Sequence, residues 1–324
     1  MSFCGAWVAR KFQMMRDYKF IVNHRLSPKN WNKSTAYMAL ASSMMLVGAY
    51  VALSKSLLQY FPPFALAWVR FLIAAVVMLP WLREWHGKVH SVPKHDRWAL
   101  FGMSFFGNFL FTICMLFGVA HTSATAAGII MSLLPAVIAL VSAWVLREHL
   151  TRVGLASVGL AVLGVMSLSL NKDAAGQSWL GNAFMVGALL CEAFYVIGAK
   201  YLTAGYTPKQ IAVAMNTFGL ILTTPLAVFQ LSDVAWGQVG WTGWLLMVFY
   251  ALAASVWATW LWFNGLRHVP ASRAGVLTVA LPLTAAAIGV ALYHESWTVY
   301  HTVAFACAVA GVVLSSWLPA TDGH

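Results

Sequence analysis

The stretch His121–Gly164, HTSATAAGIIMSLLPAVIALVSAWVLREHLTRVGLASVGLAVLG, decides the fold because the chain contains it twice. The second copy begins at His268 and reads HVPASRAGVLTVALPLTAAAIGVALYHESWTVYHTVAFACAVAG. Aligned without a gap, the copies match at their special residues: His121 with His268, Gly128 with Gly275, Pro135 with Pro282, Glu148 with Glu295 and Gly164 with Gly311. This many matches indicate that the chain is a duplicated half.

A second register extends the repeat upstream of these copies. It matches Tyr50 with Tyr195, Val51 with Val196, Lys55 with Lys200, Pro63 with Pro208 and Pro80 with Pro225. The two registers differ by only two residues. We therefore expect a basic N-terminal extension over residues 1–34, a first five-helix repeat over 35–170 and a second over 171–320.

Composition excludes a soluble globular domain. Of the 324 residues, 61% are hydrophobic and only 9% are charged, whereas soluble chains carry about 25% charged residues. Apolar segments of about 20 residues recur throughout the chain, and each is long enough to cross a hydrocarbon core of about 30 Å. A membrane barrel would need short alternating segments instead.

The apolar segments predict ten transmembrane helices, with edges good to a few residues. They cover about 36–57, 64–82, 97–119, 123–146, 150–170, 179–200, 208–230, 241–266, 271–292 and 297–318. Because each half holds an odd number of spans, the second half must enter the membrane upside down relative to the first. The predicted fold is an all-α integral membrane protein with two inverted five-helix repeats.

The positive residues sort by loop in a way that supports this count. With the N-terminus in the cytoplasm, every Lys and Arg falls on the inner side except Lys55 and Arg70, which lie within spans, and Lys172. Cytoplasmic loops of membrane proteins carry such an excess. The net charge of +11 therefore reports topology and attraction to anionic lipid rather than a nucleic-acid partner. We predict a multi-pass protein of the cell inner membrane with both termini in the cytoplasm.

Four stretches carry a resemblance to a known family. They are AYVALSK (Ala49–Lys55), FPPFALAWVRF (Phe61–Phe71), SLLPAVIALVSAWVLREHLT (Ser132–Thr151) and VALPLTAAAIGVALYHESWT (Val279–Thr298). The chain resembles the ten-helix EamA-type members of the drug/metabolite transporter superfamily. The resemblance implies a central cavity between inverted halves, and export or exchange of small organic solutes by alternating access. Members commonly have Gly before the Glu that follows the fourth helix, where this chain has Arg147.

Two charged residues lie inside predicted spans. Glu192 stands in the middle of MVGALLCEAFYVIGAK, where a charge costs about 3 kcal/mol on insertion scales. It must face the protein interior, and there it binds a substrate amine, carries a coupling proton or anchors helices; we favour the functional roles. Arg70 keeps its proton, so it must snorkel, pair or bind an anion. A grip on a carboxylate or phosphate, an outer gate and a scaffold role all stay open for Arg70.

Further candidates are polar or aromatic residues within the spans. Asn108 and Asn216 lie at mid-depth, where Asn either joins helices or lines a cavity. Trp257 and Trp260 have helical spacing and stand near Tyr250. They are candidates for an aromatic wall that stacks a flat or cationic substrate. Packing and an interfacial belt are the favoured alternative, because Trp is enriched at membrane edges.

Prolines and helix-end charges complete the candidates. Pro135 and Pro282 fall within spans at equivalent points, where each acts as a hinge or sets a fixed curvature. Glu148 and Glu295 follow the fourth and ninth spans and are expected to cap or pair at helix ends. Lys55 near the outer end of the first span favours a structural role.

The predicted function is a secondary transporter that moves a small organic metabolite, amino-acid-like or drug-like, across the inner membrane by alternating access, with export as the expected direction. The expected substrate- or proton-binding residues are Glu192, Arg70, Asn108, Asn216, Trp257, Trp260 and Tyr250. We expect no enzyme activity, no cofactor and no metal; the partners are the substrate and the lipid bilayer, with small residues packing within the bundle or across a homodimer. The alternatives are a lipid-modifying membrane enzyme, for which no nucleophile or metal motif is found, and a channel.

Overall fold

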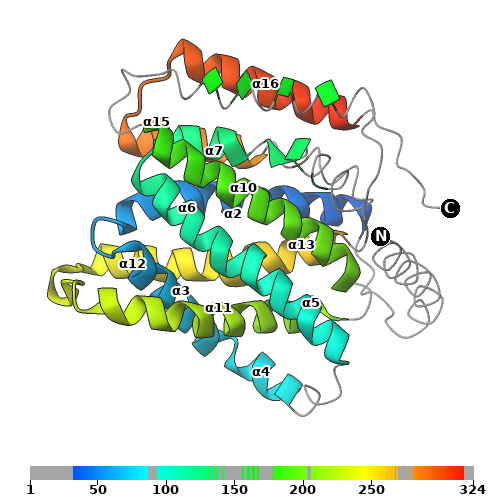
Figure 1. Ribbon diagram of the computed structural model, residues 1–324, viewed down its shortest axis with the longest axis vertical. Helices are drawn as coiled ribbons and strands as arrows, with labels where there is room; N and C mark the ends of the chain where they lie inside the picture. The colour runs from blue at the N-terminus through cyan, green and yellow to red at the C-terminus, as the bar shows by residue number, and fades with distance from the viewer. Residues whose placement is uncertain are drawn as a thin grey trace, which may run out of the picture.

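The fold is described from a computed structural model. It describes residues 32–86, 93–131, 178–202, 206–266 and 280–316, and also residues 133, 134, 136, 137, 141, 155, 156, 159, 160, 163, 164, 166, 167, 268 and 277. All regular structure in these residues is helical, as predicted (Figure 1).

The first half contributes helices that run from one short turn to the next. Its elements are α2 (Lys33–Leu57), α3 (Pro63–Val77), α4 (Leu79–His86), α5 (Lys94–Ser104), the π-helix η2 (Phe105–Leu110), α6 (Phe111–Ala120) and α7 (Ala124–Met131). The elements α5, η2 and α6 follow one another without a break and form one long helical stretch.

The second half follows the same plan. Its elements are α10 (Trp179–Leu202), α11 (Pro208–Leu231), the short 3-10 helix η3 (Trp236–Gln238), α12 (Trp241–Leu252), the π-helix η4 (Ala253–Trp257), α13 (Ala258–Leu266), α15 (Ala280–Tyr293) and α16 (Val299–Ser316). Here α12, η4 and α13 form the continuous stretch.

Four described stretches are long and apolar enough to cross a membrane, and they agree with the predicted first, third, seventh and eighth spans. They are Ser34–Leu57, Asp96–Ala120, Pro208–Leu231 and Trp241–Leu266. Shorter apolar helices cover Pro63–Val77, Trp179–Tyr195 and Ala280–Tyr293. Most of the predicted fourth and fifth spans lies outside the described residues, so the count of ten stays a prediction.

The predicted second span is interrupted where the sequence places a proline. Helix α3 ends at Val77, and α4 begins at Leu79. Pro80 has no N–H to donate, and its ring clashes with the carbonyl four residues earlier, so a continuous helix is disfavoured at this point. The span therefore bends after α3, and the exposed α4 forms one edge of the bundle (Figure 1).

The helices of the two halves pack against one another in matching pairs. Helix α3 lies along α11, and α7 lies along α15. Helix α2 packs on α13 and α15, just as its repeat equivalent α10 packs on α6 and α7. In Figure 1, α16 lies at the edge of the bundle opposite α4, and it packs against α7.

One contact occurs twice at the repeat register. A Cβ atom added to Gly118 would overlap the Met185 side chain, and one added to Gly265 would overlap Leu40. Gly118 is the repeat equivalent of Gly265, and Leu40 is the equivalent of Met185. The same close approach of two helices, which only a residue without a side chain allows, is therefore used in both halves.

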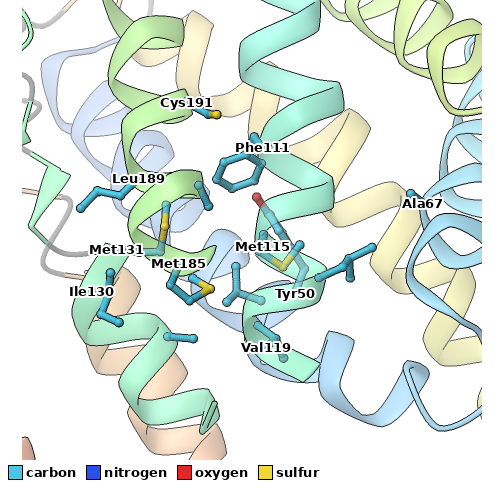
Figure 2. Packing of buried hydrophobic residues seen from close by; sticks show 14 of the residues in the cluster. Tyr50, Ala67, Phe111, Met115, Val119, Ile130, Met131, Met185, Leu189 and Cys191 are labelled. Atoms are coloured by element: carbon cyan, nitrogen blue, oxygen red, sulfur yellow. The ribbon is translucent and has the colours of Figure 1, made fainter. Parts of the chain in front are cut away.

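The central core lies where α2, α6 and α10 meet. Figure 2 shows Tyr50 from α2 among Phe111 and Met115 from α6 and Met185 and Cys191 from α10. All five side chains are buried. This packing fixes the helices that form the wall of the cavity described next.

Candidate functional site

A cavity lies at mid-depth in the bundle, between helices of both halves. Its volume is about 70 Å³, which is room for about two water molecules. The wall is formed by Ser43, Met44, Val47, Tyr50, Arg70, Gly107, Asn108, Phe111, Glu192, Tyr195, Met215, Ala254, Ala258, Thr259 and Trp262.

The two halves contribute equivalent positions to this wall. At the repeat register the pairs are Tyr50 with Tyr195, Val47 with Glu192, Arg70 with Met215, Gly107 with Ala254 and Phe111 with Ala258. The charged residues break the equivalence, because Glu192 stands where the first half has Val47, and Arg70 stands where the second half has Met215. The cavity therefore takes equivalent positions from the two halves, with an acidic side chain on one half and a cationic side chain on the other.

Arg70 is buried in the wall with most of its donors unused. Its residue is 2% exposed, and its Nη2 donates to Asn108 Oδ1 at 2.7 Å. The guanidinium carbon lies 4.5 Å from the centre of the Phe71 ring and 5.8 Å from that of Tyr250. Nε and Nη1 have no hydrogen-bond partner among the described residues. No carboxylate of a described residue forms an ion pair with Arg70.

Asn108 holds Arg70 from the π-helix η2. Its Nδ2 donates to the Met215 carbonyl of α11 at 2.9 Å, so the amide is fixed at both ends. Gly219 lets α11 lie close to Asn108 and Phe71. A Cβ atom at this position would be 3.1 Å from Asn108 Nδ2 and 2.9 Å from the Phe71 ring. The equivalent residue in the second half, Ser255, lies in the other π-helix, η4. Single π-helical turns within α-helices are frequent at functional sites.

Asn216 joins helices beside the cavity rather than forming its wall. Its Nδ2 donates to the Phe71 carbonyl at 2.9 Å, and the residue is buried. Phe71 and Asn216 are themselves repeat equivalents, so α3 and α11 meet here at corresponding positions. Of the two roles considered for Asn216, joining helices and lining a cavity, the observed hydrogen bond favours joining helices.

Glu192 reaches the cavity from α10 and is half-buried. Its carboxylate makes no hydrogen bond or ion pair with another described residue. Tyr50 lies close enough to interact electrostatically with both Glu192 and Arg70. Gly107 lies against the Tyr195 ring, where a Cβ would collide. Glu192 thus lines the cavity beside Tyr195 and Tyr50 and makes no ion pair with Arg70 of the same wall.

The tryptophans of the eighth span divide between two helix faces. Trp257 and Trp260 are 42% and 37% exposed on the outer surface, and neither lines the cavity. Trp262 does line it, together with Ala258 and Thr259. Residues three and four apart share a helix face, so Trp262 follows Ala258 and Thr259 inward while the other two tryptophans turn outward. The aromatic residues of the wall are therefore Trp262, Phe111 and the equivalent pair Tyr50 and Tyr195. The repeat register is the sequence signal that points to the tyrosines.

Tyr250 and the prolines lie around the site. Tyr250 is fully buried and makes an edge-to-face contact with Tyr50 at 5.9 Å between ring centres. Its hydroxyl lies beside the Arg70 guanidinium but forms no hydrogen bond of good geometry among the described residues. Pro282 lies in the first described turn of α15, close to where the Leu281 carbonyl abuts Gly48 of α2. Pro135 lies outside the described residues.

Glu295 caps a helix of the other half. Its carboxylate accepts from the backbone N–H of Ala124 at 2.9 Å and of Thr125 at 3.0 Å, and from the Thr125 hydroxyl at 2.8 Å. It also pairs with Lys55 Nζ at 3.0 Å. Burial raises the pKa of Glu295, but the Thr125 and Ala124 donors and the Lys55 ammonium together hold that pKa below its ordinary value. Negative charge at a helix N-terminus is favourable. The turn after α15 is therefore joined to the start of α7 and the end of α2.

Comparison with known proteins identifies the family. The EamA-like transporter family matches residues 34–170 and again residues 179–317. The uncharacterized transporter YetK of Bacillus subtilis (strain 168) is 32% identical over 86% of this chain and 86% of its own length. The uncharacterized transporter YyaM of the same organism is 23% identical over 86% of this chain and 93% of its own length.

A protein of known crystal structure shares the fold. Its TM-score is 0.61 at 17% identity, over 90% of this chain and 99% of that one. The double family match, the transporter relatives and the apolar helices agree with one another. The chain therefore belongs to the EamA-like transporter family and is a multi-pass membrane transporter.

Proposed function

We propose that the protein is a secondary transporter that exports a small organic metabolite across the cell inner membrane by alternating access. The observation that carries the proposal is the cavity, which takes equivalent wall positions from both halves and holds Glu192 and Arg70 without a direct ion pair between them. Carriers built from repeated halves bind their substrates at the repeat interface near the bilayer midplane.

The architecture in this proposal has ten helices in two inverted halves, over residues 35–170 and 171–320. The doubled contact of Gly118 with Met185 and of Gly265 with Leu40 supports it. The π-helices η2 and η4 at equivalent positions support it as well. The basic extension over residues 1–34 and both termini lie in the cytoplasm in this arrangement.

The size of the cavity favours a moving wall. Pockets for drug-sized ligands measure about 300–1,000 Å³, far more than the about 70 Å³ seen here. An amino-acid-like or drug-like substrate would need the halves to separate before it could enter. Rocking of one half against the other around a fixed site provides that opening.

The charges suit an amphoteric substrate and a coupled proton. Arg70 attracts an acidic group, and Glu192 attracts an amine or exchanges a proton. The sequence contains no Walker A motif, so ATP is not the direct energy source in this proposal. Glu192 is the residue to which we assign coupling.

Flux into liposomes tests the proposal. Purified protein is reconstituted, and an amino-acid, sugar and drug panel is screened by thermal stabilisation, after which each stabilising compound is measured for uptake with and without an imposed pH gradient. We expect at least one compound to accumulate above its external concentration when the gradient is present, which a channel cannot achieve. If every compound reaches the same final concentration inside and outside the liposomes under every pH gradient, the carrier proposal is wrong.

A further inference from the structure

We propose that Arg70, held by Asn108, forms a binding subsite for a single carboxylate group, and that the transported solute must carry such a group. This inference rests on the proposed transport function but concerns binding alone. It narrows the substrate class to carboxylic acids and amino acids, and it excludes purely cationic or neutral solutes.

The first observation is an unused set of donors on a buried cation. The single N–H of Arg70 Nε and the two of Nη1 have no partner among the described residues, although the residue is 2% exposed. A guanidinium carries five N–H donors and no acceptor. The Tyr250 hydroxyl lies beside it without forming a hydrogen bond of good geometry, so an incoming acceptor is needed to satisfy the free donors. Arg70 also lines the cavity, so an acceptor that enters the cavity can reach it.

The second observation is the way in which the guanidinium is held. Asn108 accepts from Nη2 and donates to the Met215 carbonyl, so it fixes Arg70 through a neutral amide and leaves its charge uncompensated. An Asp at the same position would have neutralised the cation. The rings of Phe71 and Tyr250 stand beside the guanidinium and limit its movement. A fixed planar fork loses little freedom when it binds a planar anion.

The third observation selects a carboxylate over a more highly charged anion. Glu192 lines the same cavity and supplies no second positive charge, so a phosphate dianion at Arg70 would keep an uncompensated negative charge in a buried site. A monoanion balances Arg70 alone. A carboxylate also matches the guanidinium in its planar geometry, and it is small enough for a cavity of about 70 Å³.

The test uses formate, the smallest carboxylate, so that it does not depend on knowledge of the natural substrate. Thermal unfolding of the purified full-length protein in detergent is followed while sodium chloride is replaced, mole for mole, by sodium formate. We expect the melting temperature of the wild type to rise with formate and to saturate. Formamide, a neutral molecule of nearly the same shape, should not raise it.

Three variants locate the effect. Arg70→Met introduces the residue of the equivalent position in the other half and should abolish the response. Asn108→Asp keeps the side-chain shape and supplies a resident carboxylate to Arg70, but it loses the donor to the Met215 carbonyl. It should no longer respond to formate, and a cooperative unfolding transition checks that the variant is folded. Asn108→Ala should weaken formate binding about tenfold, the factor that corresponds to one lost hydrogen bond to a charged group.

Arg83→Met is the matched control, since it removes the same charge from an exposed position outside the cavity. It should respond to formate like the wild type. A wild type that does not distinguish formate from chloride or formamide would overturn the proposal, as would an Asn108→Asp variant with an undiminished response. If liposomes show flux but formate has no effect on unfolding, the carboxylate subsite is rejected and the transport function is retained. If formate stabilises the protein but no flux is found, the transport function is rejected and the subsite is retained.

Discussion

At the scale of single residues, two charges account for the chemistry of the cavity. Glu192 and Arg70 both occupy positions where the other half carries an apolar residue. A charge in the membrane interior is costly. Because each charge is present in only one half, packing shared by the two halves does not explain it, and a functional role does. A duplicated fold gains a directional, chemically specific site when one half changes such a residue and the other does not.

Replacement of Glu192 by Gln tests the coupling assignment. The amide keeps the size and polarity of the side chain but cannot release a proton. We expect wild-type flux in liposomes to accelerate when a pH gradient is imposed, and flux by Glu192→Gln to be insensitive to it. Solute exchange at equal pH should persist.

The matched control is Asp233→Asn, which removes an exposed acid from the turn after α11 and should leave the response to pH unchanged. A Glu192→Gln variant that keeps the full wild-type response to the pH gradient would show that another residue carries the proton.

At the scale of elements, the turn between α15 and α16 connects three helices. Glu295 caps α7 and pairs with Lys55 at the end of α2, and Tyr293 donates to the Ala52 carbonyl of α2 at 3.1 Å. The sequence predicts that Glu295 caps or pairs at a helix end, and the structure identifies the helix that it caps. The helix is α7, from the other half, because α7 and α15 pack along each other and the end of α15 lies beside the start of α7.

This cap predicts acid-sensitive stability. Because the pKa of Glu295 is lower in the folded protein than in the unfolded chain, the unfolded chain binds more protons, and stability falls as the pH drops through the folded-state pKa. The stabilisation should be complete above the ordinary carboxyl pKa. Glu295→Gln should lower the stability at neutral pH by about 1–3 kcal/mol, since charge-assisted hydrogen bonds become neutral ones.

Thermal unfolding in detergent from neutral to acidic pH measures this effect. The melting temperatures of the wild type and of Glu295→Gln should converge as the pH falls. Lys55→Met, which removes the partly exposed ion pair but keeps the cap, should cost less. Parallel curves for wild type and Glu295→Gln over the whole pH range would contradict the assignment.

At the scale of the whole molecule, the proposed topology places the loops of the bundle on opposite sides of the membrane. The inner side takes the loop that follows α4, and the outer side takes the turn between α11 and α12. Arg83 and Gly237 are both exposed. In the proposed topology Arg83 lies on the inner side and Gly237 on the outer side.

Cysteine labelling of intact cells tests this topology. In a variant without its four native cysteines, a Cys introduced at Gly237 should react with a membrane-impermeant maleimide. A Cys at Arg83 should react only after the cells are permeabilised. Labelling of the Arg83 position from outside, or protection of both positions, would require a different number or direction of spans.

Much of this molecule was predictable from the sequence, because membrane insertion and duplication are one-dimensional properties. A span must be apolar over its length whatever its neighbours are, and repeated Gly, Pro and Glu residues reveal the second copy without coordinates. The helical class, the membrane setting and the position of Arg70 and Glu192 within apolar helices all followed from such patterns. The break after α3 was missed, although Pro80 marks it.

The composition of the cavity wall depended on tertiary structure. Which face of a helix turns inward is set by its rotation against its neighbours, and the π-helical turns in η2 and η4 shift that rotation partway along two spans. Trp262 therefore lines the cavity while Trp257 and Trp260 face outward. The sequence determined which residues must avoid lipid, whereas only the packing of helices from both halves decided which of them meet, because those contacts join residues far apart in the chain.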